Sequence, residues 1–221
     1  MDPVILTSRL KLTLITTAEI GSPELKWVHE LFSDKDATWW SILGQSKSTQ
    51  DSQSRLQNFI PKPAAEGHSK SFKIAYAVHK LLDPEESESK ADFIGLVNLV
   101  SAAASPLVLP DHLILPASEN AATETLILSY SFLPRGWGKG FATESVGAVL
   151  DFCKSLTPFW EPFAKVYIRV IVNDGNPASL RVMGKLGIQE RGIFKWTGKV
   201  WLAGGWRFED DLHIFGKYLI E

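Results

Sequence analysis

The sequence predicts an α/β domain, taken as a single unit over residues 1–221. Two observations predict this class. A strand rich in β-branched and aromatic residues, 125–132, leads through a glycine turn into a helix-forming stretch, and a second strand, 166–172, leads into another helix from Asn176. The composition fits a sizeable core, because 45% of the residues are hydrophobic and 22% are charged.

Two helices and three strands are expected ahead of the strand at 125–132. The first helix begins at Pro23, since Ser22 is a good N-cap and proline fits the first turn. The second helix ends before Pro61, because proline cannot continue a helix. The five elements are expected at residues 4–16 (strand), 23–32 and 48–58 (helices), and 72–79 and 93–100 (strands).

Two segments are expected to be loops. Residues 83–89 are acidic with proline and serine, which is typical of a solvated hairpin loop. Residues 101–116 form a connection longer than a hairpin needs, and their apolar side chains argue against full disorder. This second segment either packs near a binding site and shapes its selectivity, or is a surface loop of the lineage.

The run from Arg135 to Gly140 places three glycines at alternate positions before a helix. Such a turn can take positive φ and converge its amide N–H groups on a phosphate, to which the helix N-terminus adds positive potential. A P-loop is excluded because Gly140 follows Lys139, and a GxGxxG fingerprint would need glycine at Thr143. An ordinary strand-to-helix turn is the alternative for the glycine cluster taken alone.

The spacing of this run fits R/QxxGxG/A and resembles motif A of the GNAT superfamily, the acetyl-CoA-dependent N-acetyltransferases. A second run, 176–188, resembles the NxxSxxVxxKLGF segment of the RimJ/RimL-like branch, with Ile188 in place of phenylalanine. Residues 7–12 are similar to the TxRLxL first strand of that branch, and residues 206–212 to its last strand. The resemblance therefore spans nearly the whole chain.

The resemblance implies a GNAT-like fold, with a mixed, mostly antiparallel sheet of about seven strands and about four helices. In that fold the sheet is splayed between strands 4 and 5, which here are the strand before Arg135 and the strand from Val166. A bulge parts the two strands, and the thioester of acetyl-CoA lies in the V between them.

The resemblance also implies how acetyl-CoA binds. Backbone amides of the glycine turn hold the pyrophosphate, with charge from Lys139 or Arg135, and the strand pairs its backbone with the pantetheine arm. Asn176 hydrogen-bonds the pantetheine, although its position before Pro177 also makes it a good helix N-cap. The implied cofactor-binding residues are Tyr130, Phe132, Arg135, Gly136, Trp137, Gly138, Lys139, Gly140, Ala142, Thr143, Asn176 and Ser179.

The implied reaction is direct attack of an amine on the thioester carbonyl in a ternary complex. Many GNAT enzymes protonate the thiolate with a tyrosine seven residues after the motif asparagine, but that position is Met183, which has no proton to donate. The resemblance to the RimJ/RimL-like branch implies Ser179 as the catalytic donor instead, with solvent as the alternative.

Glu124 is the second predicted catalytic residue. It lies eleven residues ahead of Arg135, near the position of the catalytic glutamate of the histone acetyltransferase branch. Its alternative is an exposed charge at a strand start, in which case a water chain serves as the base. Near the C-terminus, 209–211 form an acidic cluster that could attract a cationic amine.

The implied partner is an amine acceptor, either a protein N-terminus or a small molecule, and the chain is expected to be a monomer or homodimer. A formal net charge of −2 gives no basic field for nucleic acid. The sequence has neither CxxC nor HExxH, so no metal is expected. A lone cysteine, Cys153, on a helix face expected to be buried, and an N-terminus without a signal peptide or membrane span, indicate the cytosol or nucleus.

Two other functions are weighed against N-acetylation. A catalytically silent acyl-CoA-binding or regulatory domain would explain Met183. A nucleotide-binding oxidoreductase would require a βαβ unit, with a second strand parallel to the first soon after Phe152, and Pro158 and Pro162 disfavour that arrangement.

Overall fold

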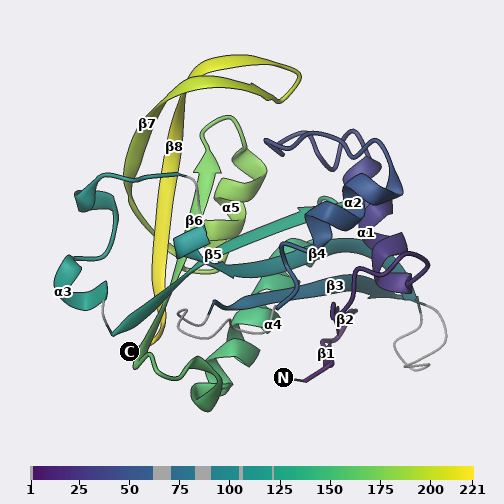
Figure 1. Ribbon diagram of the computed structural model, residues 1–221, viewed down its shortest axis with the longest axis horizontal. Helices are drawn as coiled ribbons and strands as arrows, with labels where there is room; N and C mark the ends of the chain where they lie inside the picture. Colours follow the sequence, from purple (N-terminus) through teal and green to yellow (C-terminus); the bar gives the residue numbers. More distant parts are fainter. Residues whose placement is uncertain (1, 62–70, 83–90, 105–106, 121) are drawn as a thin grey trace.

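The computed structural model describes residues 2–61, 71–82, 91–104, 107–120 and 122–221. Within them a single mixed sheet of eight strands has the order β1-β2-β3-β4-β5-β6-β8-β7, flanked by helices (Figure 1). The strands are β1 Val4–Leu6, β2 Leu10–Leu14, β3 Lys73–Leu81, β4 Ala91–Ser101, β5 Thr123–Phe132, β6 Lys165–Asn173, β7 Gln189–Leu202 and β8 Gly205–Ile220. The predicted class is confirmed, with eight strands in place of about seven, and the predicted acidic loop at 83–89 lies outside the described residues.

The single strand expected over residues 4–16 is wrong, because the structure divides it into β1 and β2. The chain turns at Thr7, whose backbone N–H donates to the Leu10 carbonyl at 2.9 Å and whose hydroxyl accepts from the Leu10 N–H at 3.0 Å. The two short strands then pair antiparallel, with Leu6 opposite Lys11. Hydrogen bonding between the Thr7 side chain and the nearby Leu10 backbone therefore interrupts the single strand that the sequence predicts.

Helices α1 (Pro23–Ser33) and α2 (Thr49–Leu56) begin where the sequence predicts. The Ser22 hydroxyl accepts from the Leu25 N–H at 3.2 Å, and Ser48 caps α2 in the same way. These helices cover one face of the sheet, where their buried side chains meet Ala75 and Ala77 of β3.

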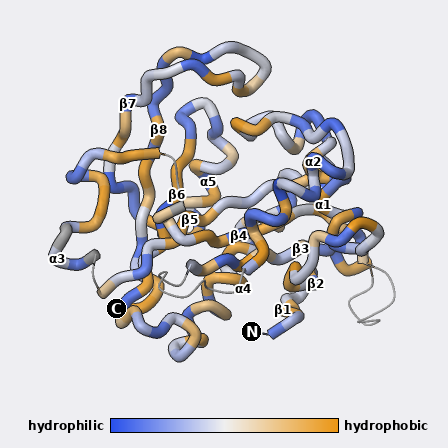
Figure 2. The backbone as a smooth tube through the Cα atoms, in the orientation of Figure 1, coloured by the Kyte–Doolittle hydropathy of each residue, from blue (hydrophilic) through white to orange (hydrophobic). Residues whose placement is uncertain are grey.

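Helices α4 (Phe141–Ser155) and α5 (Pro177–Lys185) cover the opposite face over the larger core. Alternate β3 residues, Tyr76 and Val78, point into this core, as the two-residue period of a strand requires. Cys153 is fully buried here, as the sequence predicts, and burial raises the pKa of its thiol to about 12. Figure 2 shows hydrophobic residues concentrated on the central strands and helices, with hydrophilic residues on the outer segments.

Strands β5 and β6 run parallel and separate halfway along their length. They pair from Thr123 opposite Lys165 to Ile127 opposite Arg169, and no further. The predicted splay is thus confirmed. The predicted bulge is wrong, because β4 and β5 keep an unbroken register up to Phe132. The strands part because β4 holds β5 to its end, while β8 holds β6 as far as Asn173.

A parallel β5–α4–β6 crossover is present, although the sequence disfavoured one. The 3₁₀ turn Thr157–Trp160 accommodates Pro158 near its start, and β6 begins beyond Pro162. A βαβ unit therefore does not discriminate between an acetyltransferase and an oxidoreductase in this chain.

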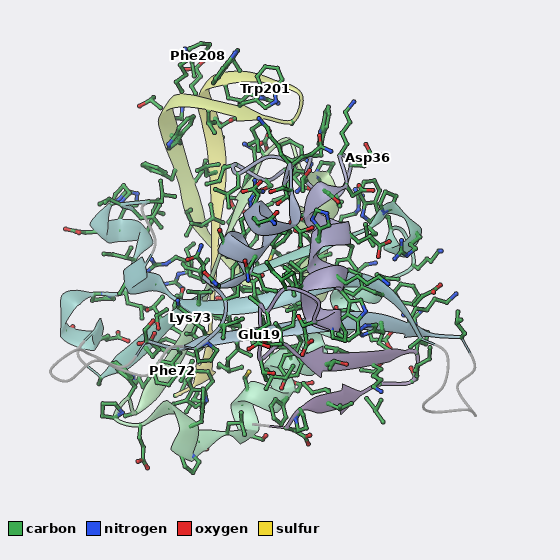
Figure 3. The ribbon with its side chains drawn as sticks, turned by 45° about the vertical axis from the view of Figure 1, so that its right-hand side comes forward. Glu19, Asp36, Phe72, Lys73, Trp201 and Phe208 are labelled. Carbon is green, nitrogen blue, oxygen red and sulfur yellow. The ribbon has the colours of Figure 1, made fainter. Side chains whose placement is uncertain are left out.

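Strands β7 and β8 form a long hairpin, of which the sequence analysis identified only the β8 part. Its two-residue turn has positive φ at Ala203 (51°) and Gly204 (77°), the backbone conformation that tight hairpins favour. Near its tip the side chains of Trp201, Trp206 and Phe208 are exposed, and Figure 3 shows Trp201 and Phe208 at this end of the molecule.

The segment expected to be a long loop packs against the sheet where the structure describes it. Leu109 and Leu113 are buried against Ile214 of β8, and a one-turn helix, α3 (Ala117–Asn120), follows. No helix in the described ranges has both the length and the apolar character to cross a membrane.

Candidate functional site

The glycine turn connects β5 to α4 through the 3₁₀ turn Pro134–Gly136. Gly138 and Gly140 have φ of 71° and 80°, which confirms the predicted positive φ. Among the described residues, no hydrogen bond uses the backbone N–H groups from Gly138 to Thr143. These amides lie beside the positive end of a 15-residue helix, so the turn is built to bind an anion.

The Arg135 side chain does not face this anion site. Its guanidinium donates to the Phe93 carbonyl, with Nε at 3.0 Å, and its Nη1 lies 2.7 Å from Glu30 Oε1 of α1. Lys139 is exposed, and its Nζ donates to the Arg135 carbonyl at 2.8 Å. Of the two predicted sources of side-chain charge, Lys139 is therefore the one that remains at the turn.

Arg9 and Glu144 brace the turn from outside, and sequence reasoning missed this role. Arg9 Nη1 donates to the Lys139 carbonyl at 3.1 Å, and its Nε lies 2.8 Å from Glu144 Oε2. The Thr7 hydroxyl donates to the other Glu144 oxygen at 2.5 Å. The TxRLxL run contains both Thr7 and Arg9, but its pattern by itself indicates only the first strand.

The unpaired end of β5 directs backbone groups towards β6. Leu133 donates its N–H to the Ile94 carbonyl of β4. Because the backbone groups of successive strand residues face opposite sides, those of Phe132 and Tyr130 face away from β4 and towards β6. The Phe132 carbonyl accepts a hydrogen bond from Trp137 Nε1 at 2.7 Å. The backbone of Tyr130 has no strand partner on the β6 side. We call this opening, between 128–132 and 170–173, the V.

Helix α5 begins at the mouth of the V. The Asn176 side chain accepts from the Ser179 N–H at 3.2 Å, which confirms that it is the N-cap. The Asn176 amide nitrogen and the Ser179 hydroxyl take no part in this bond. Met183, one turn beyond Ser179, is fully buried in the main core.

Tyr130 and Ser179 are brought together by the fold. Burial raises the pKa of Tyr130, and the neighbouring Ser179 hydroxyl opposes that effect. The Tyr130 hydroxyl is buried and makes no well-formed hydrogen bond to the described residues. Two predicted site residues from distant parts of the sequence thus meet across the V.

Glu124 lies apart from these groups. It is only 8% exposed, so its interpretation as an exposed charge is wrong. Burial raises the pKa of its carboxyl, against a smaller opposing effect of the Ser101 hydroxyl. It stands three residues before the last pair of β5 with β6, about 10 Å along the strand from the point where the V opens.

His213 of β8 ties the start of α5 to the sheet. Its Nε2 lies 3.1 Å from Asp174 Oδ1, in the turn before α5, and its Nδ1 lies 3.0 Å from Glu190 Oε1 of β7. Partial burial lowers the pKa of His213, but the bonds to both carboxylates outweigh it, and the pKa is raised.

The segment after α1 packs against the turn before α5 and the hairpin tip. The Trp40 ring packs on Gly175, where a Cβ atom would lie 2.9 Å away. The Trp39 carbonyl accepts from the Ala203 N–H at 2.9 Å. Ile42 and Leu43 of the same segment are exposed, so this segment adds apolar side chains to the surface beside the turn that precedes α5.

A hollow of about 400 Å³ lies elsewhere, lined by residues 16–19, Gln53, Gln57 and Ile60. None of the predicted site residues lines it. We take the V as the candidate site because it combines unpaired backbone, two hydroxyls and an anion turn. Within the described ranges, no three metal-ligating side chains gather in a group that could hold a metal ion.

Known proteins resemble this chain both in sequence, at the level of a family model, and in fold. A family model described as an acetyltransferase (GNAT) domain matches residues 9–189. No curated protein matches the chain. Similar solved structures include a GNAT-family acetyltransferase from Bacillus anthracis, with 17% identity, a TM-score of 0.60 and coverage of 98% of both chains.

Two further structures show the same fold at low identity. A spermidine N-acetyltransferase from Vibrio cholerae, in complex with CoA and spermine, has 16% identity and a TM-score of 0.58, covering 96% of this chain and 97% of that one. A ribosomal-protein-S5-alanine acetyltransferase from Vibrio fischeri has 16% identity and a TM-score of 0.59, covering 98% and 96%.

The His213 contacts predict a pH-dependent stability. Because its pKa is raised on folding, the stabilisation is fully present below the ordinary histidine pKa of about 6.5 and is lost as the pH rises through the folded value. We expect the free energy of unfolding of the wild type, relative to His213→Gln, to fall by about 0.5 kcal/mol over this range. Denaturant unfolding from pH 5.5 to 9 measures the difference, and high salt should reduce it. A difference independent of pH would contradict the assignment.

Proposed function

The chain belongs to the acetyltransferase (GNAT) domain family, and we propose that it transfers the acetyl group of acetyl-CoA to a primary amine by direct attack in a ternary complex. One observation chiefly supports this function. The unpaired half of β5 opens beside a turn of free amides, which offers a pantetheine chain and a pyrophosphate adjoining places.

The proposed cofactor contacts follow from the groups left unbonded. The amides from Gly138 to Thr143, at the start of α4, receive the pyrophosphate, and Lys139 adds a mobile positive charge. The backbone of Tyr130 pairs with the pantetheine amides as an added strand would. The Asn176 side-chain nitrogen is placed to bond the same arm, because only its oxygen is used in capping.

The proposed chemistry needs an amine freed of its proton and a thiolate that gains one. Ser179 lies in the first turn of α5 with its hydroxyl near Tyr130 of the V, and we assign it the protonation of the thiolate. Burial raises the pKa of the Glu124 carboxyl, which is the direction that favours a general base. Its distance from the V requires it to act through water rather than by contact.

We propose a peptide N-terminus as the acceptor. The approach to the V is bordered by exposed apolar side chains, including Ile42, Trp201 and Phe208, which can bind the side chains of a peptide. The resemblance of residues 176–188 to the RimJ/RimL-like branch also supports this acceptor.

The acceptor is tested by measuring thiol release from acetyl-CoA with spermidine and with peptides of varied first residues. We expect an apolar-rich peptide to exceed spermidine in kcat/KM by about tenfold or more, as apolar pocket contacts discriminate. A preference for spermidine would overturn the peptide assignment. Tight acetyl-CoA binding without turnover on any amine would favour a catalytically silent domain.

The pyrophosphate turn is tested by Gly138→Val, with Gly21→Val as the matched control. Both glycines have positive φ and open space around the missing Cβ, so each valine should cost about 1–2 kcal/mol of stability. Only Gly138→Val should also weaken acetyl-CoA binding, by about tenfold or more, because its side chain and altered backbone disturb the free amides. Calorimetric titration measures this, and unchanged affinity would remove the turn from the cofactor site.

Glu124→Gln tests the base. If Glu124 withdraws a proton through water, the variant should lose about 10²-fold in kcat, and the acidic limb of the pH–rate profile should disappear, with acetyl-CoA affinity unchanged. Ser101→Ala is the control, because it removes the one hydrogen bond that opposes the raised pKa and should shift that limb to higher pH. Unchanged turnover in Glu124→Gln would assign the carboxyl to the sheet interior alone.

A further inference from the structure

The hydroxyl of Tyr130 is buried without a well-formed hydrogen bond to any described residue. Buried polar groups are nearly always hydrogen-bonded, so a group left in this state calls for an explanation. Two other tyrosine hydroxyls are hydrogen-bonded: Tyr76 donates to the Asp2 carbonyl at 2.8 Å, and Tyr218 donates to Glu119. Tyr130 is also the tyrosine that belongs to the V.

The position of Tyr130 relates it to the proposed proton donor. It lies on the half of β5 that has no partner on the β6 side, while Ser179 lies in the first turn of α5. The Ser179 hydroxyl is close enough to Tyr130 to oppose the rise in its pKa. Any chain of atoms that enters the V between β5 and α5 passes beside both.

We propose that Tyr130 is the proton source of the acetyl transfer and that it acts through Ser179. The inference rests on the proposed function. In this step the amine nitrogen bonds to the carbonyl carbon, the carbon–sulfur bond breaks, and sulfur keeps the electron pair. Ser179 gives its hydroxyl proton to sulfur as Tyr130 gives its own to the Ser179 oxygen. The tyrosinate then regains a proton from solvent, which has received one from the amine.

The chemistry explains why serine would need this neighbour. An aliphatic hydroxyl alone is a far weaker acid than the thiol it must produce, whereas a phenol ordinarily titrates near pH 10, close to a thiol near 8.5. A phenol is already protonated at neutral pH. Burial makes Tyr130 a weaker acid by raising its pKa, and the Ser179 hydroxyl opposes this effect. Met183, one turn after Ser179, brings no proton to the same region.

The first test is a double-mutant cycle on the full chain with acetyl-CoA and a peptide acceptor. Tyr130→Phe and Ser179→Ala should each lower kcat by about 10- to 100-fold, with the affinity for acetyl-CoA within about threefold of wild type. The double variant should lose no more than about threefold beyond the worse single variant, because both changes break one path. Tyr76→Phe, which removes a bonded hydroxyl outside the V, should leave kcat unchanged.

Two results of this cycle would overturn the proposal. One is turnover of Tyr130→Phe within twofold of wild type. The other is a double variant whose loss is the product of the single losses, which would mean that the two hydroxyls act independently.

A second test needs no acceptor. Hydroxyls that donate to sulfur favour its thiolate form, so binding of CoA near pH 8 should release more protons to buffer in wild type than in Tyr130→Phe. Calorimetry in two buffers of different ionisation enthalpy measures this release, with Tyr76→Phe as the control. Equal release in wild type and Tyr130→Phe would sink the relay while leaving the proposed function intact. No binding of CoA or acetyl-CoA to the wild type would end both.

Discussion

The end of β5–β6 pairing at Ile127 and Arg169 is the constraint on which the site depends. Beyond this point each strand stays paired on its other side, β5 with β4 and β6 with β8, so neither can bend back to close the gap. Backbone groups in a buried sheet are almost always bonded, and a strand half left open is therefore costly. In this sheet the cost falls on the end of β5 that faces β6. A ligand with a polar chain that can hydrogen-bond like a strand is best suited to this opening.

The glycine turn is rigid because charged side chains brace its outer surface. Arg135 ties the turn to β4 and α1, and Arg9 ties the Lys139 carbonyl to Glu144. Glu144 lies in the first turn of α4, where a carboxylate also suits the positive end of the helix. Both arginine side chains therefore bond to other protein groups and hold the turn in place. Anion binding relies instead on backbone amides, whose direction does not change with side-chain rotation. A preorganised turn loses little entropy when a ligand binds.

Local patterns predicted the parts of the structure that local chemistry decides. Ser22 and Asn176 each cap a helix as the sequence predicts, because a cap and its partner are three residues apart. The split of β1 from β2 and the strand β7 were missed, although the bonds at Thr7 and the turn at Gly204 are local. The burial of Glu124 was missed because it depends on pairing with β6, a distant segment that a single sequence does not display. The guanidinium of Arg135 was misplaced for the same reason, since its partner Glu30 is 105 residues away.

The start of α5 shows how the fold keeps one hydroxyl available while fixing everything around it. Asn176 uses its oxygen to hold the Ser179 amide, and His213 holds Asp174 from the sheet side. Trp40 packs on Gly175 between them, so three contacts from different elements fix this turn. The Ser179 backbone is therefore rigid while its side-chain oxygen is left free of the cap, with Tyr130 as its polar neighbour. A hydroxyl fixed in this way can serve a reacting sulfur without rearrangement, which is the condition for efficient proton transfer in a closed site.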